Sequence, residues 1–218
     1  MSKKIAVLLS GCGVFDGAEI HESVVTLLEL DKAGAEVTCM APDIIQHKVV
    51  NHLTNTESNE SRNVLVESAR IARGEIINIS SIVAEEFDAL ILPGGFGAAL
   101  NNCDFAINGP EGQVNTDVAK LIQSFHSSAK PIGAMCIAPA LVAMALKGKG
   151  VKLTIGSDEG VAGAIAALGN THVNCATEDI VIDENHKIVT TPAYMTAGGI
   201  AQAAEGISKL VKKILDLA

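Results

Sequence analysis

The chain has 218 residues and a formal net charge of −9, and 48% of its residues are hydrophobic while only 3% are aromatic. This length suits one domain with an aliphatic core that needs neither disulfides nor a metal to fold. The apolar content excludes a disordered chain, and the acidic balance with so few aromatic rings argues against nucleic-acid binding.

Apolar runs typical of buried strands alternate along the chain with segments of helical spacing. In chain order, we expect a strand at 5–9, a helix at 18–33, a strand at 36–41, a helix at 62–73, a strand at 87–92, a helix at 112–129, a strand at 131–135, a helix at 137–147, short strands at 151–155 and 172–175, a hairpin of 180–182 with 187–191, and a closing helix at 196–217. The polar stretch 43–61 is predicted to be irregular, and a long excursion of this kind is often functional.

The alternation of strands and helices predicts an α/β fold with a mostly parallel sheet and helices on both faces. No linker or repeat divides the chain, so we expect a single domain over residues 1–218. Sites in such sheets lie beyond the carboxyl ends of the strands. The loops 10–17, 93–98 and 136–139 occupy those positions.

The cysteines and histidines favour no structural metal or disulfide. Five widely spaced cysteines contain no C-x-x-C pair, and the six histidines form no H-x-x-x-H or H-E-x-x-H pattern. This cysteine usage is typical of a reducing compartment. The apolar run 5–9 is too short for a signal peptide or a membrane span. We therefore expect a cytoplasmic protein without a metal and without membrane contact.

Cys136 lies where a predicted strand passes into a helix. Ala134 and Ala138 supply the small residues that a nucleophile elbow requires two positions before and after the nucleophile. A helix N-terminus at this point is expected to lower the pKa of the thiol. The alternative is a buried structural cysteine. Cys12, in a glycine loop at another strand end, is a candidate second thiol.

Two glycine loops accompany these cysteines. Gly94 and Gly95 follow a strand and could turn backbone N–H groups toward a developing oxyanion, although a plain turn is the alternative. The segment 11–17 has the spacing G-x-G-x-x-x-G, one residue too long for the dinucleotide fingerprint, and Met40-Ala41-Pro42 stands where an acidic residue would follow the second strand. No nucleotide cofactor is expected.

Glu22 lies in the first turns of the helix that follows segment 11–17. It shares a helix face with Glu19, and either carboxylate would also complement the helix N-terminus. A chemical role for Glu22 requires that it point at Cys136. His172 is a candidate for a polar pocket, with a structural role as the alternative.

Several motifs together resemble the ElbB family, the bacterial "enhancing lycopene biosynthesis" proteins with an amidotransferase-like domain. The resemblance covers essentially the whole chain and is carried by residues 10–22, 51–54, 62–67, 93–99, 136–140 and 187–195. ElbB-like proteins belong to the PfpI and class I glutamine amidotransferase-like superfamily. The resemblance implies a flavodoxin-like three-layer sandwich, and homodimers are common in the superfamily.

The resemblance also implies roles for individual residues. Cys136 corresponds to the elbow nucleophile, Glu22 to a glutamate that hydrogen-bonds it, and the N–H groups of Gly95 and Ile137 to the oxyanion hole. Gly94 is expected to bind substrate beside them. ElbB is similar to glyoxalase members of the superfamily, which convert glyoxal to glycolate without a cofactor.

Two departures from the superfamily pattern limit the activity. Ile137 stands where PfpI-type proteases carry a histidine, and residues 191–195 lack the His-x-Glu pair of glutamine amidotransferases. Neither a protease nor a glutaminase is expected, because the cysteine lacks a histidine base; His172 is an accessory candidate. The leading hypothesis is a weak glyoxalase, a lyase acting on a small reactive aldehyde. The alternative is a non-enzymatic redox or electrophile sensor, or a regulatory binding protein, that uses Cys136.

Overall fold

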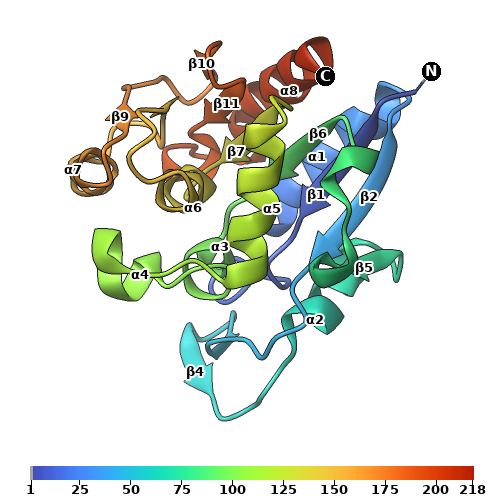
Figure 1. Ribbon diagram of the computed structural model, residues 1–218. Helices are drawn as coiled ribbons and strands as arrows, with labels where there is room; N and C mark the ends of the chain where they lie inside the picture. Colours follow the sequence, from blue (N-terminus) through green and yellow to red (C-terminus); the bar gives the residue numbers. More distant parts are fainter. Residues whose placement is uncertain (1) are drawn as a thin grey trace.

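A seven-stranded sheet forms the centre of the computed structural model, which describes residues 2–218 (Figure 1). The strand order is β10-β11-β7-β6-β1-β2-β5, and every neighbouring pair is parallel except β10 with β11. The strands are β1 (Lys4–Leu8), β2 (Glu36–Ala41), β5 (Ile76–Asn78), β6 (Ala89–Leu92), β7 (Ile132–Met135), β10 (Val181–Asp183) and β11 (Ile188–Thr191). The predicted flavodoxin-like α/β fold and the predicted hairpin are confirmed.

Helices cover both faces of this sheet. They are α1 (Ile20–Lys32), α2 (Val64–Ile71), α3 (Phe96–Leu100), α4 (Phe105–Asn108), α5 (Thr116–Ser127), α6 (Ala138–Ala145), α7 (Glu159–Ala167) and α8 (Ile200–Leu217). Along β1, Ala6 and Leu8 belong to the apolar cluster that includes α5 and α6, while Ile5 and Val7 belong to the cluster that includes α8. Both faces of the strand are buried, which explains its uninterrupted apolar sequence.

The structure differs from the sequence prediction in its short elements. The stretch 43–61 contains a hairpin of β3 (Val49–Asn51) and β4 (Thr56–Ser58). The runs 151–155 and 172–175 contribute β8 (Lys152–Leu153) and β9 (Thr171–His172), which pair with each other outside the main sheet. Strands of two or three residues carry no readable alternation of polar and apolar side chains.

Some helices and one edge strand were also not expected. The helices α3, α4 and α7 and the strand β5 lie in segments without a predicted element. Helix α7 contains Gly160 and Gly163, which weaken a helical pattern. The other three span only three to five residues, so each is shorter than the window in which periodicity can be recognised.

The loops at the carboxyl ends of β1 and β6 are joined by backbone hydrogen bonds. Phe96 N donates to Val14 O over 2.8 Å, and Gly97 N donates to Gly17 O over 2.9 Å. Glu19 N, just before α1, donates to Gly94 O over 2.9 Å. This confirms that the loops 10–17 and 93–98 meet at one edge of the sheet.

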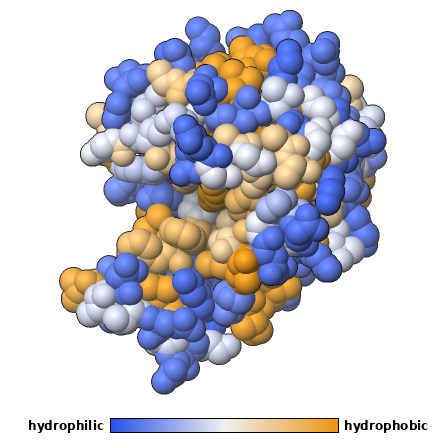
Figure 2. All heavy atoms as spheres, turned by 90° about the vertical axis from the view of Figure 1, so that its left-hand side faces the viewer, coloured by the Kyte–Doolittle hydropathy of each residue, from blue (hydrophilic) through white to orange (hydrophobic). Residues whose placement is uncertain are grey.

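The surface of the molecule has a projecting hairpin and a hollow. The β3–β4 hairpin extends away from the sheet (Figure 1). A hollow bordered by hydrophobic residues separates the lower part of the molecule from the main body (Figure 2). Within residues 2–218, no helix combines the length and the hydropathy needed to cross a bilayer.

Candidate active site

Cys136 follows β7 directly and has the left-handed backbone angle φ = +57°. Residues with a Cβ rarely adopt this conformation, and strained residues of this kind cluster at active sites and in tight turns. Ala134 and Ala138 are fully buried on either side of the turn, and helix α6 begins at Ala138. The residue is 8% exposed. The expected strand-to-helix elbow is therefore present, and only a small part of Cys136 reaches the surface.

Glu22 lies in the first turn of α1, is fully buried and points at Cys136. Its Oε2 accepts a hydrogen bond from Gly94 N over 2.8 Å, and its Oε1 accepts one from Tyr194 N over 3.2 Å. The Cys136 thiol lies beside the same carboxylate, and this contact opposes the rise in the pKa of Glu22. Glu19 instead caps the helix, because its Oε2 accepts a hydrogen bond from Glu22 N over 2.7 Å.

The glycine loop after β6 fits closely around this pair. A Cβ on Gly94 would lie 2.5 Å from Cys136 Cβ and 2.9 Å from both Cys136 Sγ and Glu22 Oε2, so only glycine fits. Gly95 has φ = +91°, and its N–H and that of Ile137 lie near Cys136 Sγ, where they favour the thiolate. Thiol, carboxyl group and backbone donors thus come together from the turn after β7, the first turn of α1 and the loop after β6.

The environment raises the pKa of both acidic groups. Burial, followed by the charge of Glu19, raises the pKa of Glu22 to about 7, although the N–H groups of Gly94 and Tyr194 oppose the rise. Burial, followed by the charge of Glu22, raises the pKa of Cys136 well above that of a free thiol. The lowered thiol pKa expected from the helix N-terminus is wrong, because these two effects outweigh the N–H groups of Gly95 and Ile137.

Among residues 2–218, neither accessory candidate hydrogen-bonds Cys136 or Glu22. His172 Nε2 accepts a hydrogen bond from Ile155 N over 3.3 Å and so links β9 to the chain after β8. Cys12 is half-buried, and burial followed by the charge of Glu67 raises the pKa of its thiol. Within residues 2–218, no histidine side chain hydrogen-bonds Cys136.

Sequence reasoning missed the part played by Tyr194. Its backbone N–H holds one oxygen of Glu22, while its hydroxyl lies 2.8 Å from His21 Nδ1 on α1. A backbone donor leaves no trace in residue type. The motif 187–195 marked the segment without indicating this contact.

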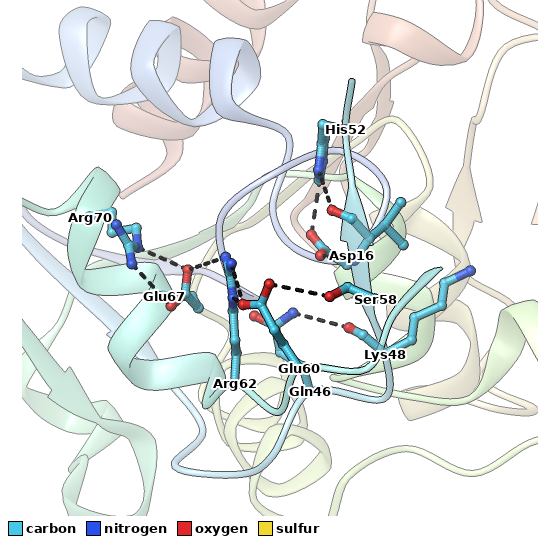
Figure 3. A network of polar contacts seen from close by, with 10 residues as sticks. Asp16, Gln46, Lys48, His52, Ser58, Glu60, Arg62, Glu67 and Arg70 are labelled. Carbon is cyan, nitrogen blue, oxygen red and sulfur yellow. Dashed lines mark hydrogen bonds and ion pairs between the residues drawn. The ribbon is translucent and has the colours of Figure 1, made fainter. Parts of the chain in front are cut away.

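Polar contacts, one of them buried, join the loop after β1 to the β3–β4 hairpin (Figure 3). Asp16 Oδ2 accepts a hydrogen bond from Val50 N over 2.7 Å, and His52 Nε2 accepts one from Phe15 N over 3.2 Å. His52 Nδ1 lies 3.0 Å from the carbonyl oxygen of Val50. These contacts give His52 a structural role.

A second group of charges stands beside the first in Figure 3. Arg62 pairs with Glu60 over 2.7 Å and approaches Glu67 at 3.5 Å, while Arg70 pairs with Glu67 over 2.9 Å. Each arginine is therefore matched by a carboxylate. In the described part of the chain, no group of three or more His, Cys, Asp or Glu side chains is arranged to hold a metal ion.

Comparison with known proteins extends these observations. The sequence profile of the DJ-1/PfpI family matches residues 3–204. The chain is 44% identical to the rat "ES1 protein homolog, mitochondrial" over 98% of this chain and 84% of that protein. It is also 44% identical to the human "Glutamine amidotransferase-like class 1 domain-containing protein 3, mitochondrial", over 98% and 83% of the two chains.

A solved structure is similar over nearly its whole length. It is an isoprenoid biosynthesis protein with an amidotransferase-like domain from Ehrlichia chaffeensis, with a TM-score of 0.93, 38% identity and 99% of each chain covered. This similarity supports the expected amidotransferase-like fold.

The relatives bear on the predicted cellular location. The rat and human proteins are both named as mitochondrial, which contradicts the predicted cytoplasmic location. The prediction is wrong because it depended on the short apolar run 5–9, which tests only for a secretory signal or a membrane span.

Proposed function

Since the chain belongs to the DJ-1/PfpI family, we propose that it is a cofactor-independent glyoxalase of the ElbB type, with Cys136 as nucleophile and Glu22 as proton carrier. The observation that carries this proposal is the Cys136 thiol lying beside a fully buried carboxyl group whose pKa is about 7. Such a pKa suits a group that both takes up and releases protons near neutral pH. The 38% identity to an isoprenoid biosynthesis protein supports the ElbB assignment.

The first step is addition of the thiol to an aldehyde. With Glu22 ionised, its carboxylate accepts the thiol proton as sulfur bonds to an aldehyde carbon of glyoxal. Glu22 passes this proton on to the aldehyde oxygen, which becomes the hydroxyl of a hemithioacetal, and Glu22 is ionised again for the next step. The N–H groups of Gly95 and Ile137, which lie near Sγ and favour its negative charge, would stabilise the oxygen while it carries negative charge.

The second step moves hydrogen within the substrate. Glu22 takes the proton from the carbon bonded to sulfur, giving an enediol, and a proton returns to the neighbouring carbon. The result is a thioester of glycolate on Cys136. Water then cleaves the thioester, releasing glycolate and restoring the thiol. One carbon is oxidised and the other reduced, so the reaction needs no external oxidant or reductant.

Other activities find less support at this site. Protease and glutaminase chemistry uses a histidine base beside the cysteine, and within residues 2–218 Cys136 has only the Glu22 carboxylate in that role. A redox sensor needs an accessible thiolate. Cys136 is 8% exposed, and its pKa is raised.

The proposal is tested by incubating pure protein with glyoxal and measuring glycolate. We expect turnover by the wild type and its loss in Cys136→Ala. Cys175→Ala, which removes a half-buried thiol elsewhere, is the matched control and should retain turnover. Glycolate formation that is unchanged in Cys136→Ala would overturn the assignment of the nucleophile.

A further inference from the structure

The chain has five phenylalanines, and only two of them are not buried. Phe87, Phe105 and Phe125 lie in the core, whereas Phe96 is 49% exposed and Phe15 is half-buried. Both rings line one cavity of about 390 Å³, together with Lys48, Val50, Asn55 and Glu57. The chain has few aromatic residues, yet two of its phenylalanine rings line the same cavity. Because these rings lie outside the core, core packing does not explain their position.

One residue of the cavity wall adjoins the candidate active site, although Cys136 and Glu22 do not themselves line the cavity. Phe96 follows Gly95, whose N–H lies near Cys136 Sγ, and consecutive Cα atoms are about 3.8 Å apart. The hydrogen bond from Phe96 N to Val14 O holds this residue against the loop that carries Phe15. The positions of both residues are therefore set by the same backbone contacts that position the Gly95 donor.

The outer wall of the cavity is the β3–β4 hairpin. Asp16 accepts the hydrogen bond from Val50 N, and the ring of His52 lies 4.9 Å from that of Phe15. The hairpin is thus attached to the loop after β1, and the wall is part of the folded structure.

The lining of the cavity indicates what it would bind. Two phenyl rings and Val50 present an apolar surface, and ligand pockets of about 300–1,000 Å³ are commonly lined in this way. Lys48 and Glu57 contribute opposite charges, and neither takes part in an ion pair among residues 2–218. With one charge of each sign, the lining favours a neutral apolar group over an ion.

We infer that this cavity binds the apolar, preferably aromatic, substituent of a 2-oxoaldehyde substrate, so that Phe15 and Phe96 determine specificity. The inference rests on the proposed glyoxalase function and extends it to a substrate class. Glyoxal has no substituent and would leave the cavity unused. An aryl group would stack on the two rings while its aldehyde reached Cys136.

The kinetic test compares phenylglyoxal with glyoxal through initial rates. The wild type is expected to show the higher kcat/KM for phenylglyoxal, and Phe96→Ala to lower the ratio of the two kcat/KM values about tenfold, the usual effect of losing an apolar contact. Phe96→Leu should restore much of the ratio. Leu53→Ala removes an apolar side chain that is 94% exposed at the tip of the same hairpin and should leave the ratio unchanged. An equal ratio in wild type and Phe96→Ala would overturn the inference.

A binding test separates this inference from the proposed function. Mandelate, the hydroxyacid expected from phenylglyoxal, should bind the wild-type protein more tightly than glycolate does, and about tenfold more weakly to Phe96→Ala. If neither aldehyde is turned over while this pattern of binding is found, the cavity is supported and the glyoxalase reaction is rejected. If glyoxal is turned over and mandelate binds no better than glycolate, the reaction stands and the cavity assignment is rejected.

Discussion

Cys136 and Glu22 are each held in an unfavourable state. A left-handed conformation at a residue with a Cβ costs on the order of 1–3 kcal/mol. Glu22 is fully buried, and within residues 2–218 neither Lys nor Arg pairs with it. Two hydrogen bonds to its carboxyl group, from Gly94 and Tyr194, and the neighbouring Cys136 thiol compensate only in part, since its pKa remains raised.

The charge of Glu22 controls the ionisation of the thiol. Glu22→Gln removes the negative charge that helps raise the pKa of Cys136, so we expect the pKa of the thiol to fall. The measurement is the rate of iodoacetamide alkylation of the Cys136 peptide as a function of pH, followed by mass spectrometry. Glu29→Gln, near the other end of α1 and paired with Lys32, is the control. A rise in the thiol pKa would instead mean that a protonated Glu22 stabilises the thiolate.

The same carboxyl group sets the pH dependence of turnover. The mechanism requires Glu22 to be ionised, so kcat/KM for glyoxal should increase as the pH rises through about 7. In Glu22→Gln the rate should fall on the order of 10²–10⁴-fold, even though its thiol ionises more readily. A wild-type rate that is constant from about pH 5 to pH 9 would contradict the role of Glu22 as base.

At the scale of the elements, three loops from β1, β6 and β7 create the site, and each depends on close backbone approach. Gly94→Ala would place a methyl group against Cys136 Sγ and Glu22 Oε2 at 2.9 Å. We expect turnover to be lost while the circular dichroism spectrum is kept, because the added methyl group occupies the position between thiol and carboxyl group.

Gly163→Ala offers a matched control for that substitution. Gly163 lies in α7, and a Cβ there would meet no atom within 4 Å. Alanine in a helix interior is more stable than glycine by about 0.5–1 kcal/mol. This variant should therefore keep full turnover and show a slightly higher melting temperature. Equal turnover by Gly94→Ala and Gly163→Ala would mean that the close approach at Gly94 is not needed for activity.

The long elements and the nucleophile elbow were predictable from the sequence because their signals are local. A run such as 5–9 is apolar throughout, and Cys136 stands between two alanines at a strand end. The contact between Glu22 and Cys136 could be predicted only from the family resemblance, since the two residues are 114 positions apart in the sequence. The raised thiol pKa was not predictable, because burial around Cys136 is a property of the assembled fold.

At the scale of the whole molecule, the buried carboxyl group makes stability depend on pH. The pKa of Glu22 rises from 4.5 to about 7 on folding, so between these values the unfolded chain releases a proton that the folded chain retains. The free energy of unfolding therefore decreases as the pH rises through this range, by on the order of 3 kcal/mol from this group.

Glu22→Gln removes that dependence. The free energy of unfolding of the variant minus that of the wild type should be larger at about pH 8 than at about pH 5. The reason is that only the wild type carries the buried charge at the higher pH. Urea unfolding at the two pH values measures the difference. A stability difference between variant and wild type that is independent of pH would contradict the raised pKa of Glu22.

The most direct test of the central claim is to trap the thioester on Cys136. Wild-type protein turning over glyoxal is quenched with acid, which preserves a thioester, and its peptides are analysed by mass spectrometry. The account predicts a mass increase of one glyoxal molecule on the Cys136 peptide, reduced in Glu22→Gln and absent before substrate is added. Continued glycolate production without such an adduct on the wild-type enzyme, or an adduct only on another cysteine, would contradict it.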